Sequence, residues 1–345
     1  MAFINILILH CEGPASGACG VSIFLVLSGF LMMYSYYDRD LSCSLKDCIT
    51  FSVKKIKRLY PLHIIMMALP MLFSLRSIIL NFSYKGLLDF IIQIILNITL
   101  LQAWVPVTKF YFSLNMVAWY LSVCLFIYAV FPFILRKFKK MKMNKIIFVG
   151  IIVFVCQIIV CILLKFFNPF STSYYFTYIF PIFRLGDFVI GCCLGYIFIN
   201  VDFNFNRTQA TIIEFISLIL FACSEFVFLK SIGILGSYHF KYSVLFIPSS
   251  VTLVMTFAIN KGFISKALAW KSIVYIGNIS PYAFLIHNNI IIIVRIFMYK
   301  LILSESSMWF KPVLIVVSFV LTVLSSAAYM AIERKLRPVL TKKFN

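Results

Sequence analysis

The sequence predicts an all-α fold: a polytopic membrane bundle of about ten transmembrane helices plus one interfacial or re-entrant helix. Hydrophobic residues make up 63% of the 345 residues and charged residues only 12%, whereas soluble domains are near half apolar and a quarter charged. Apolar stretches close to the ~20 residues of a spanning helix recur along the whole chain. Strand-type alternation is absent, which excludes a barrel.

The apolar stretches place the spans in order along the chain. Full-length spans are expected at 19–37, 61–80, 113–135, 146–164, 178–199, 211–229, 242–259, 273–298 and 312–332. A further stretch at 2–10 would cover only ~15 Å as a helix, about half the hydrocarbon thickness. We therefore expect the first span to be clipped at its N-terminal end. No repeat, linker or low-complexity tract interrupts the pattern, so residues 1–345 are expected to form one domain.

Charge placement sets the expected orientation. Residues 39–58 and 136–145 carry six basic groups each, which favours the cytoplasm for both loops. An even number of crossings must then separate them, so the apolar stretch at 87–104 is predicted to lie at the outer face without crossing. One helical face of this stretch carries Asp89, Gln93 and Asn97. Both termini are then cytoplasmic, in a multi-pass protein of the cell (inner or plasma) membrane.

Composition also argues against several functions. The net charge of +20 does not indicate nucleic acid, because the basic residues gather in short loops between apolar runs. The ten cysteines form no Cys-x-x-Cys pair and fall mostly in apolar segments, which favours buried thiols over a metal site or a disulfide framework. Gly-x-Ser-x-Gly, Walker and His-Glu-x-x-His motifs are absent, so soluble hydrolases, ATPases and zinc proteases have no support.

His10 is the leading candidate for chemistry. It falls at the outer end of the first span, ahead of the loop at 11–18. Ionisable groups are costly in lipid, and an imidazole titrates near neutral pH. His10 is therefore a candidate general base for a hydroxyl that arrives from outside. The alternative is an ordinary polar residue at a membrane boundary.

A basic run opens the span at 61–80. Lys55 and Arg58 belong to this run, which leads into Pro61 at the start of a helix. Cations beside a helix N-terminus suit a polyanionic ligand such as coenzyme A, whose phosphates favour Arg and Lys. The alternative is anchoring by the positive-inside rule.

Charged residues inside spans indicate a polar cavity. Arg184 and Asp187 are three residues apart, so they can pair on one helix face. His287 and Arg295 lie on roughly the same side of the span at 273–298. Such groups usually line a cavity within the bundle, and the alternative is a structural polar cluster between helices.

Six segments, in this order, resemble the acyltransferase family 3 pattern. They are His10 with Gly20, Val21, Phe24, Ser28, Gly29 and Phe30; Lys54, Lys55, Ile56, Arg58, Leu59, Tyr60 and Pro61; Trp119, Leu121, Ser122, Tyr128, Phe131 and Pro132; FPIFRLGDFVIGCCLG at 180–195; IGNISPYAFLIH at 276–287; and Tyr329 with Glu333. The family usually has an acidic residue where this chain has Ser22, a glutamate where it has Cys124, and an arginine about eleven residues before the histidine.

The resemblance implies a membrane-embedded O-acyltransferase. Its members commonly move acetyl from acetyl-CoA onto hydroxyls of a surface or exported polysaccharide or its lipid-linked precursor. By this resemblance His10 is the catalytic residue, and Lys55 and Arg58 contact the acyl-CoA. The expected partners are the lipid bilayer, the acyl-CoA as donor substrate and a glycan acceptor, with no bound cofactor, metal or nucleic acid. A transporter or flippase and a glycan polymerase are the alternatives.

Overall fold

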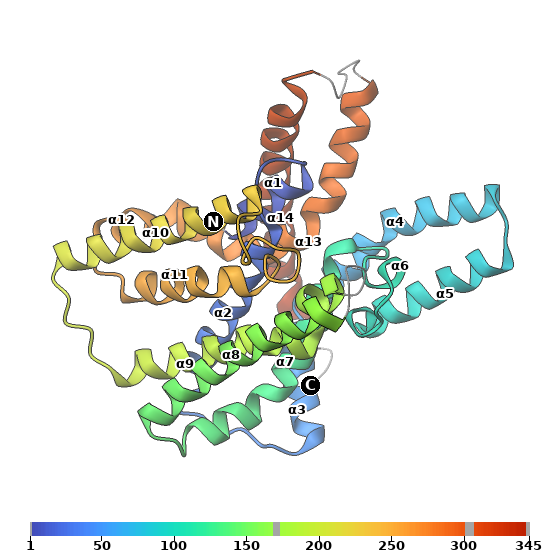
Figure 1. Cartoon of the computed structure of the whole chain (residues 1–345). Coiled ribbons are helices and arrows are strands. Elements are labelled where there is room, and N and C mark those ends of the chain that lie inside the picture. The colour runs from blue at the N-terminus through green and yellow to red at the C-terminus, as the bar shows by residue number, and fades with distance from the viewer. Residues whose placement is uncertain (1, 168–172, 301–306, 343–345) are drawn as a thin grey trace.

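A computed structural model describes residues 2–167, 173–300 and 307–342, and every regular element within these ranges is helical (Figure 1). The helices are α1 (Ala2–His10), α2 (Gly17–Tyr36), α3 (Leu45–Ile56), α4 (Tyr60–Leu80), α5 (Tyr84–Thr99), α6 (Thr108–Tyr111), α7 (Trp119–Phe138), α8 (Met143–Phe167), α9 (Pro181–Asn200), α10 (Arg207–Lys230), α11 (Ile247–Ile259), α12 (Phe263–Leu268), α13 (Lys271–Lys300) and α14 (Phe310–Lys342). Short single-turn elements are η1 (Gln102–Trp104), η2 (Met116–Ala118), η3 (Tyr175–Ile179) and η4 (Val244–Phe246). The predicted all-α class is confirmed.

Eight of the described helices are long and apolar enough to cross a membrane. They are α2, α4, η2 with α7, α8, η3 with α9, α10, α13 and the part of α14 up to Leu336. The other two crossings in the predicted set are shorter: α1 has nine residues, and η4 with α11 forms an apolar helix at Val244–Ile259. The tail after Arg334 continues α14 as far as Lys342, and its last three residues lie outside the described ranges.

Helices α2 and α9 form the most extensive helix–helix contact of the fold. Their backbones approach closely at glycines: a Cβ on Gly29 would lie 2.0 Å from the Phe188 carbonyl oxygen, and one on Gly191 would lie 2.0 Å from the Val26 carbonyl oxygen. Small residues allow such approaches between membrane helices, where van der Waals contact drives association. The contact fixes α9, with its buried charges, along α2 from Ser22 to Phe30.

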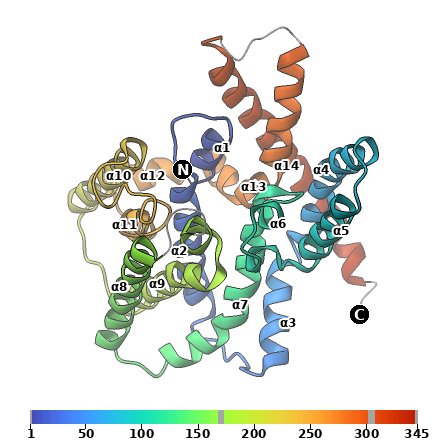
Figure 2. The same cartoon turned by 45° about the vertical axis from the view of Figure 1, so that its right-hand side comes forward.

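A second group of helices consists of α1, α13 and α14. Leu7 of α1, Ala283 of α13 and Leu314 of α14 belong to one buried apolar cluster. Figure 2 shows α13 and α14 rising together beside α1, with α2 continuing into the body of the molecule. This packing places the C-terminal end of α1 against the middle of α13.

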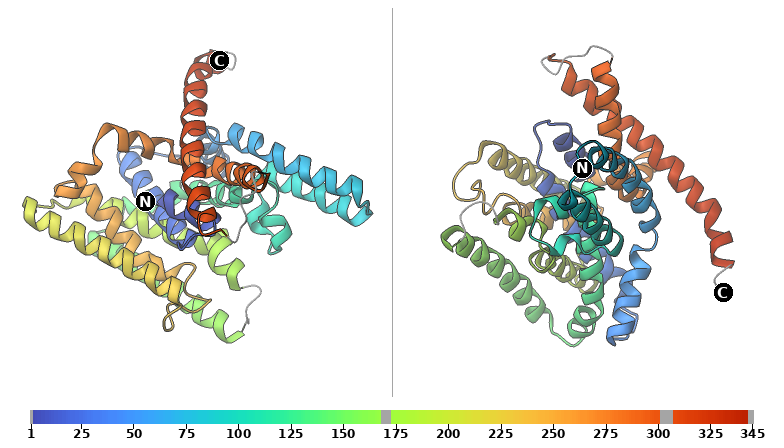
Figure 3. Two further views of the ribbon diagram at one scale, coloured as in Figure 1. Left: turned by 90° about the horizontal axis from the view of Figure 1, so that it is seen from above. Right: turned by 90° about the vertical axis from the view of Figure 1, so that its right-hand side faces the viewer.

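The apolar stretch predicted at 87–104 forms α5 as far as Thr99 and then η1, and α5 pairs with α4 as a hairpin that extends away from the other helices (Figures 1 and 3). Its polar residues share one face, as predicted. Asp89 bonds Lys109 at 2.6 Å, the Gln93 amide donates to the Lys109 carbonyl oxygen, and the Asn97 amide donates to Ser113 Oγ at 2.7 Å. α5 ends at Thr99, and the residue after it, Leu100, has a left-handed φ of 55°. Its placement at the outer face stays a prediction.

The basic loop predicted at 39–58 contains a helix, α3, that packs against α7. Ser44 caps its N-terminus by accepting from the Asp47 backbone amide, and Ser52 donates its hydroxyl to the Leu125 carbonyl oxygen. Lys54 and Lys55 lie in its last turn, where cations favour the helix dipole. The sequence analysis did not predict this amphipathic helix, because its basic residues were interpreted as part of a loop.

Candidate active site

His10 is the last residue of α1, and the turn that follows is tightly held. The Gly13 backbone amide donates to the Ile8 carbonyl oxygen at 2.8 Å, and Glu12 adopts a left-handed φ of 60°, a conformation that costs a non-glycine residue about 1–2 kcal/mol. Ser16 then caps α2 by accepting from the Cys19 amide. The exit of α1 and the start of α2 are therefore fixed by local structure.

A carboxylate of α10 also holds these two segments. Glu225 accepts a hydrogen bond from the Asn5 side chain on α1 at 2.9 Å and another from the Ser16 backbone amide at 3.0 Å. Charge-assisted bonds of this kind are stronger than neutral ones. Glu225 thus couples α1 to the N-terminus of α2 and limits movement of His10.

The structure brings His10 and His287 together. Their ring centroids are 5.1 Å apart with an interplanar angle of 69°. His287 is fully buried. Its Nδ1 lies 3.2 Å from the Ala283 carbonyl oxygen. A proton on Nδ1 satisfies that contact and leaves the Nε2 lone pair free. Within the described residues, His287 Nε2 is buried and has no hydrogen-bond partner.

Aromatic side chains surround the histidine pair. Phe3 and Phe284 contact the His287 ring at centroid distances of 5.8 and 5.9 Å, and Phe284 in turn contacts Phe24 and Tyr120. Apolar walls strengthen electrostatic interactions within a site because they lower the local dielectric. Electrostatic interactions of the two imidazoles with a reacting group would therefore be weakly screened by water.

Arg295 also lies near the end of α1. Its Nη2 is 2.9 Å from Glu12 Oε1, and Lys311 Nζ is 4.0 Å from Glu12 Oε2. Arg295 follows His287 by two helical turns on α13, so α13 contacts the His10 region both at the ring and at the following turn. Three of the residues predicted to be functional, His10, His287 and Arg295, thus gather at the contact between α1 and α13.

Arg184 and Asp187 belong to a different cluster, between α2, α8 and α9. The two side chains are fully buried and form an ion pair of 2.9 Å. Every described contact of this cluster is internal to the bundle: Asp187 accepts from Ser22 and Gln157, while Arg184 donates to the Tyr178 and Tyr242 carbonyl oxygens. A buried pair needs such additional bonds to offset desolvation. The arrangement is that of a structural crosslink, and no described contact joins it to the histidines.

Arg58 contacts Glu333, which belongs to the motif formed by Tyr329 and Glu333 near the C-terminus. Its Nε lies 3.3 Å from Glu333 Oε2, although the two residues are 275 positions apart, and its guanidinium lies over the Tyr282 ring at 5.1 Å. Tyr282 donates its hydroxyl to the same Glu333 oxygen at 2.7 Å. The Arg58 side chain remains 48% exposed, so part of the guanidinium is free to meet a ligand.

Lys55 is held separately. Its ammonium donates to the Tyr36 hydroxyl and also lies over the Tyr36 and Phe51 rings. The described contacts therefore place Lys55 between α2 and α3 and Arg58 beside α13 and α14. The two cations predicted to bind acyl-CoA are near in sequence but have different neighbours.

Helix α13 connects the two regions. Tyr282 contacts Arg58 and Glu333, and His287, five residues later, contacts His10. Five residues of helix rise about 7.5 Å. The exposed cation and the histidine pair are thus close along one rigid element.

Sequence reasoning assigned no function to two buried amides near this helix. Asn115 is 1% exposed, and neither its Nδ2 nor its Oδ1 has a partner within the described residues. It directly precedes η2, which packs against α13. Asn289 donates to the Met66 carbonyl oxygen while its Oδ1 is unpartnered in the described part. The polar run after His287 (Asn288, Asn289) inside an apolar span was the available signal.

The described residues contain no group of three or more His, Cys, Asp and Glu placed to hold a metal ion. The clustered groups are instead imidazoles, amides and cations. These are groups suited to proton transfer, to hydrogen bonding of a polarised carbonyl, and to binding of an anion.

Comparison with known proteins agrees with this arrangement. The acyltransferase family 3 model, described as an acyltransferase domain, matches residues 1–331. The chain therefore belongs to this family and is a multi-pass membrane protein of its helical type. It is also similar to the acyltransferase MdmB of Streptomyces mycarofaciens, with 28% identity over 134 residues, 38% of this chain and 31% of the relative. The match thus spans about a third of that relative's length. No solved structure matches the chain.

Proposed function

We propose that this protein is a membrane O-acyltransferase that moves an acyl group, in the simplest case acetyl from acetyl-CoA, onto a hydroxyl of an exported or surface polysaccharide or its lipid-linked precursor. The family supports acyl transfer, and the similarity to an acyltransferase supports it further. The single observation that favours it most is the contact of His10 with His287, whose Nε2 is buried and without a partner in the described residues, within an aromatic surrounding.

In this proposal His10 is the general base. The acceptor oxygen attacks the thioester carbonyl carbon and forms the C–O bond of the ester, and His10 takes the hydroxyl proton. The C–S bond breaks, and the proton passes to the departing thiolate of coenzyme A. His287 positions the His10 ring, because its own ring is fixed by the Ala283 carbonyl oxygen and by Phe3 and Phe284.

Asn115 is suited to stabilise the oxyanion that forms during this transfer. A buried amide without partners costs free energy, and an amide N–H directed at developing charge supplies a large part of many enzymes' catalysis. Asn115 precedes η2, which contacts α13. We therefore infer that its Nδ2 donates to the thioester oxygen in the transition state.

Arg58 is proposed to bind a phosphate of the donor. Glu333 and Tyr282 hold the guanidinium from one side, and this leaves its exposed N–H groups in a fork suited to phosphate. Lys55 adds a second cation in the same motif. The short path along α13 would then place the acyl end of the donor near His10.

The test is acyl transfer by His10→Ala in membrane vesicles with radiolabelled acetyl-CoA, alongside release of free coenzyme A thiol. A positioned base contributes ~10²–10⁴-fold in rate, so we expect a loss of that size at unchanged expression. His63→Ala is the matched control, because His63 bonds the Asn97 carbonyl oxygen between α4 and α5. Transfer at the normal rate in a well-expressed His10→Ala protein would refute the assignment of the base.

A further inference from the structure

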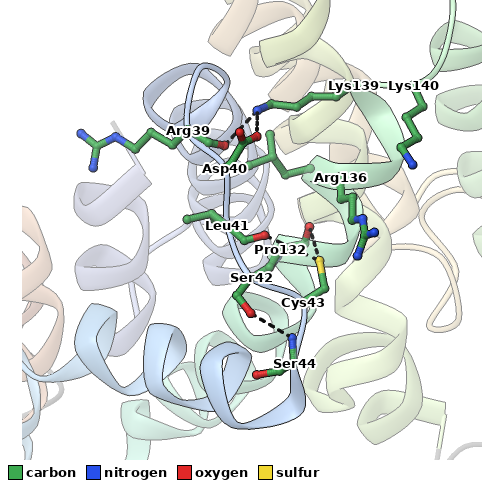
Figure 4. Close-up of a pocket in the computed structure, with 11 residues that line it drawn as sticks. Arg39, Asp40, Leu41, Ser42, Cys43, Ser44, Pro132, Arg136, Lys139 and Lys140 are labelled. Carbon is green, nitrogen blue, oxygen red and sulfur yellow. Dashed lines mark hydrogen bonds and ion pairs between the residues drawn. The ribbon is translucent and has the colours of Figure 1, made fainter.

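A cavity of ≈ 670 Å³ lies between the segment joining α2 to α3 and the C-terminal end of α7 (Figure 4). It is lined by Arg39, Asp40, Leu41, Ser42, Cys43, Ser44, Pro132, Leu135, Arg136, Lys139 and Lys140. Both lining segments are predicted to face the cytoplasm. None of these residues belongs to the site built around His10 and Arg58.

The cavity is rich in positive charge. Four of its lining residues are cations and one, Asp40, is a carboxylate. Lys139 Nζ bridges Asp40 at 3.0 Å and the Arg39 carbonyl oxygen at 2.9 Å, so the single carboxylate is already neutralised. Arg39 directs its guanidinium over the Tyr36 ring at 4.8 Å.

Two cations remain available to a ligand. Arg136, in the last turn of α7, and Lys140, in the turn after it, both line the cavity, and Figure 4 shows their charged ends separate from the bridge that Lys139 makes. Within the described residues neither side chain makes a hydrogen bond or an ion pair with a carboxylate. Because one belongs to the last turn of α7 and the other to the turn that directly follows the helix, both cations come from the same end of this wall.

The opposite wall is fixed in place. Cys43 Sγ donates to the Pro132 carbonyl oxygen at 3.5 Å, which joins the segment to α7. The Ser42 and Ser44 hydroxyls both donate to Asp47, and these bonds lower the pKa of the Asp47 carboxyl. The two hydroxyls are therefore occupied, and an anion in the cavity would be bound by the cations. A pre-formed wall reduces the ordering cost of binding.

We propose that this cavity is a binding site for a phosphate-bearing anion, with Arg136 and Lys140 as its principal ligands. The guanidinium fork matches phosphate oxygens, and a lysine adds a mobile point charge. Two sources share this chemistry: the headgroup of an anionic phospholipid, which basic pockets between membrane helices bind, and a soluble phosphate or diphosphate. The site does not depend on the proposed transfer reaction.

The experiment compares two double variants of the purified full-length protein. Arg136→Gln/Lys140→Gln removes the two available cations of the cavity, and Lys142→Gln/Lys145→Gln removes two exposed cations of the predicted loop at 136–145 that do not line it. Both variants lower the loop charge equally, so the positive-inside effect is matched. Monodisperse elution of both in detergent establishes that each is folded.

Two probes identify the source of the phosphate. Inorganic pyrophosphate is titrated by calorimetry in detergent, and phosphatidylglycerol retention is counted by native mass spectrometry after extraction from phosphatidylglycerol or phosphatidylcholine nanodiscs. We expect the cavity variant alone to weaken binding of one probe by at least about tenfold, since loss of even one charge-assisted bond costs about that factor. Loss for pyrophosphate assigns a soluble ligand, and loss for phosphatidylglycerol assigns a lipid. Equal loss in both variants, or none in either, would overturn the site.

Discussion

At the scale of single residues, His10 is defined by what holds it. Its ring meets His287, and two residues later the backbone turns through Glu12 in a left-handed conformation. Strained residues persist where the surroundings fix them, and here the Glu12 carboxylate is bound to Arg295. A mobile histidine would be a poor base, because proton transfer requires a heavy-atom distance near that of a hydrogen bond. The contacts that fix His10 are therefore consistent with the proposed role as a base.

Substitution of Asn115 can distinguish a structural role of this side chain from a catalytic one. Replacing a buried, unpartnered amide by an apolar side chain of similar shape is nearly neutral or stabilising, so Asn115→Leu should keep or raise the melting temperature in detergent. Removing an oxyanion donor typically costs ≈ 10²–10³ in kcat, so acyl transfer should fall by about that factor. A fall in both stability and activity together would show that Asn115 only supports the fold.

Substitution of Arg58 should weaken binding of the acyl-CoA donor and leave the rate of the chemical step nearly unchanged. Arg58→Ala removes the exposed fork that we assign to a phosphate, so the KM for acetyl-CoA should rise about tenfold or more while kcat changes little. Lys54→Ala is the control, because Lys54 is an exposed cation of the same run. Kinetics at limiting and saturating acetyl-CoA measure both constants. Equal effects of the two substitutions would assign the run to membrane anchoring.

At the scale of helices, the contact between α2 and α9 controls where the buried ion pair lies. Ser22 on α2 bonds Asp187 on α9, and the close approach at Gly191 permits this contact. Overpacking a well-packed interface usually costs 1–3 kcal/mol. Helix α9 cannot shift freely, because Gly195 also packs tightly on α2: a Cβ there would lie 2.7 Å from the Phe30 carbonyl oxygen.

We therefore expect Gly191→Ala to lower thermal stability in detergent, by roughly 1–3 kcal/mol, since its Cβ would lie 2.0 Å from the Val26 carbonyl oxygen. Gly277→Ala on α13 is a matched control: no atom lies within 4 Å of its added Cβ, and alanine is about 1 kcal/mol more favourable than glycine inside a helix. Fluorescence-detected size-exclusion chromatography after heating measures both. Equal melting temperatures for Gly191→Ala and the parent would contradict the tight contact.

At the scale of the whole molecule, the sequence predicted what depends on local pattern. Hydropathy identified the long helices, and the three-residue spacing of Arg184 and Asp187 predicted their pairing, because residues three apart share a helix face. The contact of Arg58 with Glu333 bridges 275 positions, and no local spacing can predict it. The same holds for His10 with His287. The charged residues inside spans were expected to line a polar cavity. The described contacts of Arg184 and Asp187 are made between α2, α8 and α9, whereas His287 and Arg295 contact the end of α1 and the turn after it.

The orientation of the whole chain rests on charge placement alone, and it can be tested with three positions. Lys85 is an exposed residue in the first turn of α5, Thr108 is an exposed residue at the start of α6, and Lys142 is an exposed residue of the loop between α7 and α8. If α5 does not cross, the first two must lie on the same outer side and the third in the cytoplasm. Lys85→Cys, Thr108→Cys and Lys142→Cys are made one at a time in a background without other reactive cysteines.

An impermeant maleimide applied to intact cells should label the first two variants, and Lys142→Cys should react only after permeabilisation. The physical reason is the face that α5 presents: Asp89, Gln93 and Asn97 bond the segment at 109–113, so its polar side is satisfied by a neighbouring loop, as an interfacial helix requires. Labelling of Lys85→Cys without Thr108→Cys would mean that α5 crosses. That result would move the loop at 136–145, and with it the cationic cavity, to the outer face.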